Sequence, residues 1–360
     1  MMPFRVTNHN CHDLVRWQVR DQTRFEFFED LNRPFSFFRV QGDLEPDIVL
    51  TVGPFKPDEG LGQFQINHKY RVGLNYVYCR ENLAKGWYEV EIRGLDDSRV
   101  AVRFNGRPGL LARAVAPLVL VHQWVLRQVI SYHLFRQNAH LLHGAGICRV
   151  GHAIVLAGRG GAFKTSIAMD LVRQEGYKCL GDDAVIVSNA RAYPFPTHPQ
   201  LFAYRALHLQ DEKLGGLLGR IGALKFLLRS DPAGSNSWEG LFARTSQPLG
   251  ALVVVGRTHS EAAPTIQRIG RETAVERLVA NDYLEIAAEA SYMGQAPTPL
   301  VRYLDAYAMV YPNSYAATLR QNTARVIRRS LGNTACYELV LPASYDENVA
   351  KRVIEMISDL

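Results

Sequence analysis

Residues 158–165 read Gly-Arg-Gly-Gly-Ala-Phe-Lys-Thr, and this stretch could hold phosphate groups. Gly158, Lys164 and Thr165 match the phosphate-loop spacing G-x-x-x-x-G-K-[S/T]. In such a loop the backbone N–H groups surround the phosphates, the lysine neutralises the β- and γ-phosphates, and the hydroxyl binds Mg²⁺. With the residue that follows, the stretch predicts a nucleotide site made of Gly158, Arg159, Gly160, Gly161, Ala162, Phe163, Lys164, Thr165 and Ser166.

A dinucleotide-binding fingerprint, G-x-G-x-x-G, is the competing template, because Gly158 and Gly160 also match its start. Both templates fail at Phe163, where each has a glycine. A hydride-transfer cofactor has no use for the Lys164-Thr165 pair, so this pair favours the phosphate loop. Phe163 leaves two alternatives: the backbone there has an ordinary φ and tolerates a side chain, or nucleotide binding is altered or lost.

Two carboxylates, Asp182 and Asp183, follow the helix that the loop opens. Beside a phosphate loop, one carboxylate can hold Mg²⁺ and the other can accept a proton from an attacking hydroxyl. An acidic turn between two strands is the simpler alternative. His143 ends the strand before the loop strand and could orient an aspartate, and Arg257 ends a later apolar run and could contact a transferring phosphoryl group.

The elements that must position these residues follow from the apolar pattern. Strand, glycine loop, helix and strand succeed one another as in a βαβ-like unit. We predict strands over residues 140–150 and 151–158, joined by a turn around Gly151, and further strands over 177–181, 184–188, 249–257 and 335–342. We predict helices over 166–176, 272–292, 313–330 and 345–360. The fold class is α/β, or α+β for the whole chain.

Three segments differ in character. Residues 1–108 are strand-rich and predict a small antiparallel sheet domain, with a tight turn at Asn105-Gly106. Residues 109–137 predict a connecting helix. Residues 138–360 predict the α/β domain, in which the glycine- and serine-rich loop 230–240 has the composition of a mobile lid.

Composition excludes several classes of protein. The net charge of +6 is spread evenly along the chain, which argues against a nucleic-acid partner. Five scattered cysteines without a C-x-x-C pair predict reduced thiols in a cytoplasmic protein. The longest apolar stretch, residues 110–126, is interrupted by Arg113, Pro117 and His122, so we expect no membrane span.

The segment "LLHGAGICRVGHAIVLAGRGGAFKTSIAMDLVRQEGYKCLGDDAVIV" resembles the HPr kinase/phosphorylase superfamily and its HPr-kinase-like relatives. The resemblance covers residues 140–188. It implies a P-loop HPr-kinase-like core, a mixed sheet flanked by helices, that uses ATP and Mg²⁺ to phosphorylate a serine-type hydroxyl. It implies that Lys164 and Thr165 bind phosphate and Mg²⁺. It also makes Asp182 the catalytic base, Asp183 a metal-side carboxylate and His143 the aspartate's partner.

Departures from the family pattern bear on the acceptor. Phe163 breaks the loop, "AYRALHLQDEKLGG" stands where an arginine-glycine signature is expected, and the N-terminal region differs. These departures argue against HPr as the substrate. Relatives occur beside genes for modified peptides, which implies a peptide or protein acceptor. A small alcohol or sugar as acceptor, a catalytically silent nucleotide-binding scaffold and a homo-oligomer all stay open.

Overall fold

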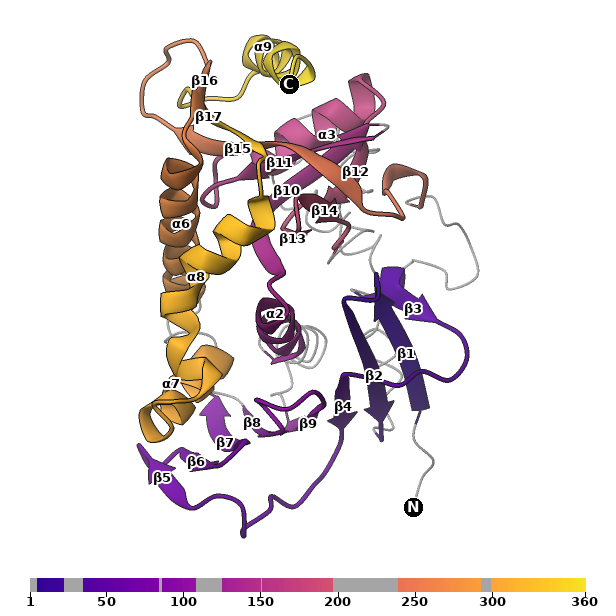
Figure 1. The fold of residues 1–360 in the computed structure, drawn as a ribbon, viewed down its shortest axis with the longest axis vertical. Coiled ribbons are helices and arrows are strands. Elements are labelled where there is room, and N and C mark those ends of the chain that lie inside the picture. The colour runs from indigo at the N-terminus through magenta and orange to yellow at the C-terminus, as the bar shows by residue number, and fades with distance from the viewer. Residues whose placement is uncertain are drawn as a thin grey trace. The chain divides into compact units, whose positions relative to one another are not determined.

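The computed structural model describes residues 5–22, 35–83, 86–107, 125–149, 151–196, 239–292 and 299–360 (Figure 1). It has an α+β fold with two mixed sheets. The chain forms two compact units, 1–137 with 286–323, and 138–285 with 324–360. Whereas we predicted one domain over 138–360, residues 286–323 thus group with the N-terminal segment. The predicted helix residues 109–124 and lid residues 230–238 lie outside the described part of the chain.

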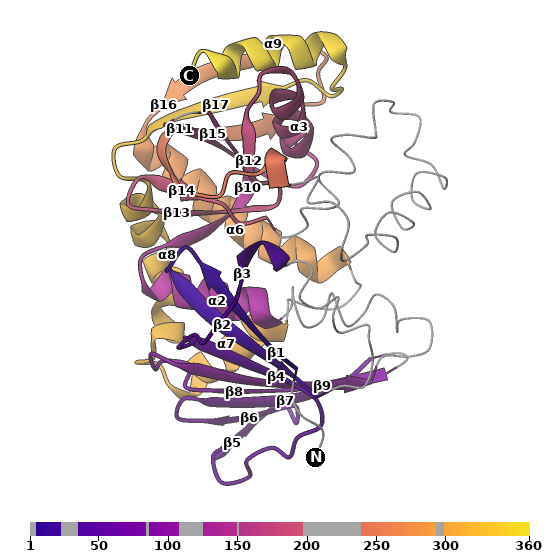
Figure 2. The ribbon, with the colours of Figure 1, turned by 90° about the vertical axis from the view of Figure 1, so that its right-hand side faces the viewer.

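The first unit contains, among its described residues, one nine-stranded sheet in the order β3-β1-β2-β4-β9-β8-β7-β6-β5 (Figure 2). Its strands are β1 (Arg5–Cys11), β2 (Val15–Asp21), β3 (Arg39–Val40), β4 (Ile48–Val52), β5 (Phe64–Ile66), β6 (Tyr70–Gly73), β7 (Tyr76–Leu83), β8 (Gly86–Arg93) and β9 (Val100–Arg107). A short 3₁₀ helix, η3 (Ser36–Phe38), precedes β3.

This sheet differs from the small antiparallel sheet that we predicted. Strand β4 runs parallel to both β2 and β9, so the sheet is mixed. The predicted turn at Asn105-Gly106 is wrong: both residues lie inside β9, opposite Glu89 and Tyr88 of β8. Pairing with β8 outweighs the local turn preference, because strand propensity depends strongly on tertiary context.

Two helices, α2 (Arg127–Arg136) and α7 (Pro299–Val310), pack against strands of this sheet. Alternate residues of β2, such as Trp17 and Val19, are buried, whereas consecutive residues are buried along β7 and β8, so both faces of the sheet are covered there. Helix α2 confirms the described part of the predicted connecting helix. Helix α7 was not predicted.

The second unit contains an eight-stranded sheet, again among its described residues. Its strands are β10 (His140–Arg149), β11 (His152–Ala157), β12 (Lys178–Gly181), β13 (Ala184–Ser188), β14 (Arg191–Tyr193), β15 (Gln247–Arg257), β16 (Thr265–Ile269) and β17 (Ala335–Leu341). Pairing runs from β11 through β10, β13 and β14 to β15, and β15 pairs with β11 again, so these strands form a closed circuit. A short 3₁₀ helix, η7 (Glu239–Leu241), precedes β15.

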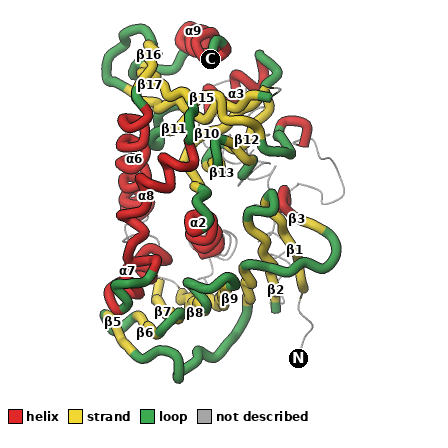
Figure 3. Tube along the Cα trace, in the orientation of Figure 1, coloured by secondary structure: helices red, strands yellow, loops and turns green. Residues whose placement is uncertain are grey.

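Among its described residues, four helices contribute to this unit: α3 (Lys164–Gln174), α6 (Arg271–Tyr292), α8 (Tyr315–Leu331) and α9 (Glu347–Ser358). The predicted helices are confirmed, with ends shifted by a few residues; strands β14 and β16 were not predicted. Figure 3 shows these helices and strands along the Cα trace. Helix α3 is closed by Gly176 at a φ of +68°, and the Asp346 carboxylate accepts a hydrogen bond from Val349 N at 2.9 Å to cap α9.

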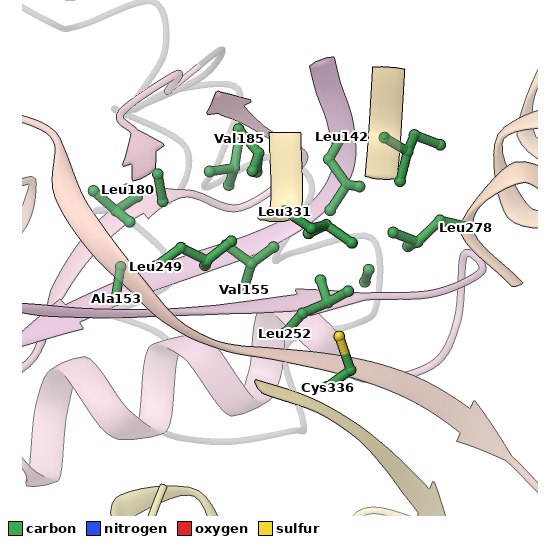
Figure 4. Close-up of a cluster of buried hydrophobic side chains, with 14 of the residues drawn as sticks. Leu142, Ala153, Val155, Leu180, Val185, Leu249, Leu252, Leu278, Leu331 and Cys336 are labelled. Atoms are coloured by element: carbon green, nitrogen blue, oxygen red, sulfur yellow. The ribbon is translucent and has the colours of Figure 1, made fainter. Parts of the chain in front are cut away.

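One cluster of buried hydrophobic side chains in the second unit brings strands of its sheet together with α6 and α8. Val155 and Leu252 point to the same cluster as Leu278 of α6 and Leu331 of α8 (Figure 4). Because strand residues alternate between faces, Ile154 and its alternate neighbours point to the opposite face, where α3 and α9 pack on each other. The glycine loop, residues 158–165, follows the C-terminal end of β11 and leads into the first turn of α3.

None of the described helices has the length and apolar character needed to cross a membrane. All five cysteines carry free, buried thiols.

Candidate functional site

The glycine loop connects β11 to α3, as the sequence predicts. Gly158 has a φ of +156°, and a Cβ at this position would lie 2.4 Å from Val255 O. Only glycine therefore fits where the loop passes β15. Gly160 and Gly161 have no atom within 4 Å of an added Cβ, and Gly161 has a φ of +81°. This part of the loop backbone is open to an approaching ligand.

Phe163 has the left-handed conformation that a glycine would adopt, with φ of +57° and ψ of +14°. The alternative of an ordinary φ at this position is therefore wrong. A non-glycine residue in this conformation costs about 1–2 kcal/mol. Phe163 is also the residue that precedes the first turn of α3, so its conformation sets the direction in which the loop enters the helix.

The Phe163 side chain stacks on Tyr345, with ring centroids 5.3 Å apart and planes 26° apart. The guanidinium of Arg257 lies over the same ring, with Cζ 4.5 Å from the centroid. An aromatic pair contributes about 0.5–1.5 kcal/mol and an exposed cation–π contact about 0.5–1 kcal/mol. Together they are large enough to offset the backbone cost of the left-handed conformation.

Lys164 is 6% exposed, and its ammonium is bound to the loop itself. Its Nζ donates to Gly158 O at 2.5 Å and to Arg159 O at 2.8 Å. The charge therefore sits inside the curve of the loop, at the place where a bound phosphate would be neutralised. Ser166 is half-buried in the first turn of α3, and the side chain of Arg159 is exposed.

The first turn of α3 contacts the connection between β12 and β13 through Thr165. Thr165 Oγ1 lies 3.5 Å from Asp182 O, at the long end of hydrogen-bond distances. Asp182 and Asp183 form the whole connection between β12 and β13, which both pair with β10. The structure thus brings the backbone of the predicted acidic pair to the predicted Mg²⁺-binding hydroxyl.

His143 lies beside Asp183. Its Nδ1 is 3.6 Å from Asp183 Oδ1, and the neighbouring Gly144 N donates to Asp183 O at 3.3 Å. We expected His143 to end its strand, but it lies within β10, opposite Ala184 of β13. The pairing of β10 with β13 is what places the imidazole next to the acidic pair.

Arg257 ends β15, as predicted, and points back to the loop. Its guanidinium donates to Gly161 O at 3.5 Å and to Ala343 O. In this structure the predicted phosphoryl-contacting arginine therefore binds two backbone carbonyls, one from the glycine loop and one from the segment after β17. Arg257 still lies within the site, because Gly161 belongs to the loop.

Tyr345 and Asp170 are parts of the site that sequence reasoning missed. Tyr345 OH donates to Asp170 Oδ2 of α3 at 3.0 Å. Burial raises the pKa of Tyr345 above its ordinary value, with the nearby Asp170 carboxylate adding to this, so the phenol stays a donor. Burial also raises the pKa of Asp170, against the opposing effects of Tyr345 and Arg173. The one sequence signal for Tyr345 is its position directly before Asp346, the residue that caps α9, which fixes the backbone of this segment.

The donors at the site fit Mg²⁺ as a partner of a nucleotide. The Thr165 hydroxyl and the Asp183 carboxylate are the hard oxygen ligands that Mg²⁺ uses together with substrate phosphates. In the described part of the chain no group of three or more His, Cys, Asp and Glu side chains could hold a metal ion. The protein ligands would thus supply only part of the coordination.

Comparison with known proteins adds no family to this geometry. No protein-family model matches the chain, and no match is found among the curated proteins.

Proposed function

We propose that this protein is an ATP-dependent kinase that transfers the γ-phosphoryl group to a hydroxyl, in the first place a serine of a peptide or protein. The observation that carries the proposal is the contact of Thr165 Oγ1 with the backbone carbonyl of Asp182 at 3.5 Å, which joins the start of α3, with its Lys164-Thr165 pair, to the Asp182-Asp183 connection between β12 and β13. The order of these residues, which resembles that in HPr-kinase-like proteins, supports the same reading. We therefore also propose that the second unit is an HPr-kinase-like core.

The glycine loop binds the nucleotide in this proposal. Its backbone N–H groups, with those at the N-terminus of α3, donate hydrogen bonds to the phosphates, and Lys164 exchanges the carbonyls of Gly158 and Arg159 for phosphate oxygens. Thr165 and Asp183 would hold Mg²⁺, whose positive charge would stabilise the β- and γ-phosphates. Catalysis at such a site consists mainly of positioning and charge stabilisation.

The two aspartates have different roles in this proposal. Asp182 accepts the proton of the attacking hydroxyl. Asp183 is a metal-side carboxylate, and His143 beside it serves as the outer partner that fixes its orientation. This division differs from one in which His143 orients the base, because the described ion pair joins His143 to Asp183.

A non-catalytic nucleotide-binding scaffold is the second candidate. Phe163 favours it, since a side chain fills the glycine position and its ring is packed against Tyr345 and Arg257. A scaffold of this kind would bind nucleotide without transferring phosphate. The two candidates therefore share the loop and differ in whether Asp182 has a chemical role.

Calorimetric titration with Mg²⁺-ATP, followed by transfer of radiolabelled γ-phosphate, tests the proposal. We expect binding by the wild type, none by Lys164→Ala, and label on serine peptides in a mixed set of peptides and small alcohols. Asp182→Asn should bind ATP but lose transfer, and label on the alcohols alone would move the acceptor to small molecules. Binding without transfer to any acceptor would favour the scaffold, and no binding at millimolar ATP would overturn both.

A further inference from the structure

We propose that Tyr345 and Arg257 are positioning residues that hold Phe163 in its left-handed conformation, and that the segment after β17 thereby controls the affinity of the glycine loop for nucleotide. We call Phe163, Arg257 and Tyr345 the aromatic latch. The affinity part of this inference rests on the proposed function, whereas the conformational part does not.

The loop needs a latch because Phe163 lacks the conformational freedom of glycine. At a φ of +57° its backbone is in a region that side chains disfavour. Neighbouring Gly161 has a φ of +81°, which costs a glycine nothing. Without other contacts, Phe163 would favour a right-handed or extended backbone, and the N–H groups of the loop would be displaced. Residues outside the loop must therefore stabilise the left-handed conformation of Phe163.

The two holding groups reach Phe163 from other elements. Arg257, at the end of β15, donates to Gly161 O inside the loop and to Ala343 O beyond β17. Tyr345 follows Ala343 closely and stacks on the ring. The same short segment, residues 342–346, thus supplies both an anchor for Arg257 and the stacking ring.

The latch is tied to the helix that follows the loop. Tyr345 OH donates to Asp170 of α3, and Asp346, the next residue, caps α9. Helices α3 and α9 also pack on each other. The glycine loop, the Phe163 ring, Tyr345 and α3 therefore form a closed set of contacts. A change in residues 342–346 should alter the conformation of the loop.

A double-mutant cycle isolates the latch, because glycine at position 163 adopts the left-handed conformation without help. The variants of the full chain are Phe163→Gly, Tyr345→Ala and the double variant, with Phe163→Ala and Tyr345→Phe as matched controls. Two quantities are measured for each: the Kd for Mg²⁺-ATP, and the hydrogen exchange of loop amides 159–165 without nucleotide.

We expect Tyr345→Ala to raise the Kd about tenfold and to accelerate loop exchange when Phe163 is present, and to change neither by more than about twofold in the Phe163→Gly background. Phe163→Ala should weaken binding, because it keeps the strain and loses the stack, whereas Phe163→Gly should not. Tyr345→Phe keeps the ring but loses the hydrogen bond to Asp170, so its effects should lie between those of the wild type and Tyr345→Ala.

Two results would overturn the inference. One is an equal effect of Tyr345→Ala in both backgrounds, which would make Tyr345 a general structural residue. The other is an unchanged loop exchange in Tyr345→Ala. If the wild type binds no Mg²⁺-ATP, the proposed function fails, but the exchange cycle without nucleotide still decides whether the latch exists.

Discussion

The guanidinium of Arg257 lies over the ring of Phe163, 4.5 Å from Cζ to the ring centroid. The same guanidinium donates to two carbonyl oxygens, Gly161 O in the glycine loop and Ala343 O in the segment after β17. This contact joins the end of β15 to the residue that replaces a glycine in the phosphate-loop pattern. Phe163, which departs from the phosphate-loop pattern, and Arg257, which stabilises it, therefore belong to one local structure.

Arg257 should affect nucleotide affinity more than turnover. Arg257→Ala removes the cation–π contact and two hydrogen bonds, so we expect the Kd for Mg²⁺-ATP to rise about tenfold. Arg257→Lys keeps the charge but lacks the planar fork that spans two carbonyls, so it should restore little. Titration calorimetry and steady-state kinetics separate the effects. A large loss of kcat at unchanged Kd would instead mean that Arg257 contacts the transferring phosphoryl group.

Gly158→Ala should destabilise the second unit strongly. The added Cβ would meet Val255 O at 2.4 Å, and the φ of +156° disfavours a side chain, so we expect a loss of roughly 2–4 kcal/mol. Gly160→Ala is the matched control, because nothing lies within 4 Å of its Cβ. Urea unfolding measures both. Equal midpoints for the two variants would contradict the close approach of the loop to β15.

His143→Gln should raise the Mg²⁺ concentration needed for half-maximal activity by about 10–100-fold, as the loss of an outer partner of a metal ligand does. The reason is the position of His143 Nδ1, 3.6 Å from Asp183 Oδ1. In the Asp183→Asn background the same change should have little further effect. Additive losses in the double variant would show that His143 acts through another group, such as Asp182.

The first unit should lose stability as the pH falls. Burial, and to a lesser degree Arg39, lowers the pKa of His9 to about 3, whereas the unfolded chain titrates near its ordinary value of 6.5. Below pH 6.5 the unfolded state therefore binds the extra proton. The free energy of unfolding should fall by up to about 1.4 kcal/mol per pH unit until pH reaches about 3, and full stability is present above 6.5.

His9→Phe provides the control for this pH dependence. It keeps a ring against Trp17, on which His9 stacks at 5.0 Å between centroids, but it cannot titrate. The urea midpoint of the wild type, compared with that of His9→Phe from pH 7.5 to 4.5, should drop more steeply. Burial also lowers the pKa of His133, but that effect is common to both proteins. Parallel curves would mean that the pKa of His9 is not lowered in the folded state.

Much of the second unit could be predicted because its signals are local. The glycine at 176 and the Asp346 cap end and begin helices through neighbouring residues, so α3 and α9 follow from short stretches of sequence. The first unit was harder. Its Asn105-Gly106 pair has turn chemistry, yet strand pairing across β8 and β9 takes it into a sheet.

The glycine loop with its lysine and hydroxyl, the acidic pair and the order of strand, loop and helix could all be predicted from the sequence, because they depend on spacing within a short segment. Three features became known only from the folded chain: the left-handed conformation of Phe163, the contacts of Tyr345 and Arg257 with its ring, and the position of His143 beside Asp183. These contacts join residues from separate strands and helices. Sheet pairing and helix packing bring them together, and no local pattern records which distant side chains will meet.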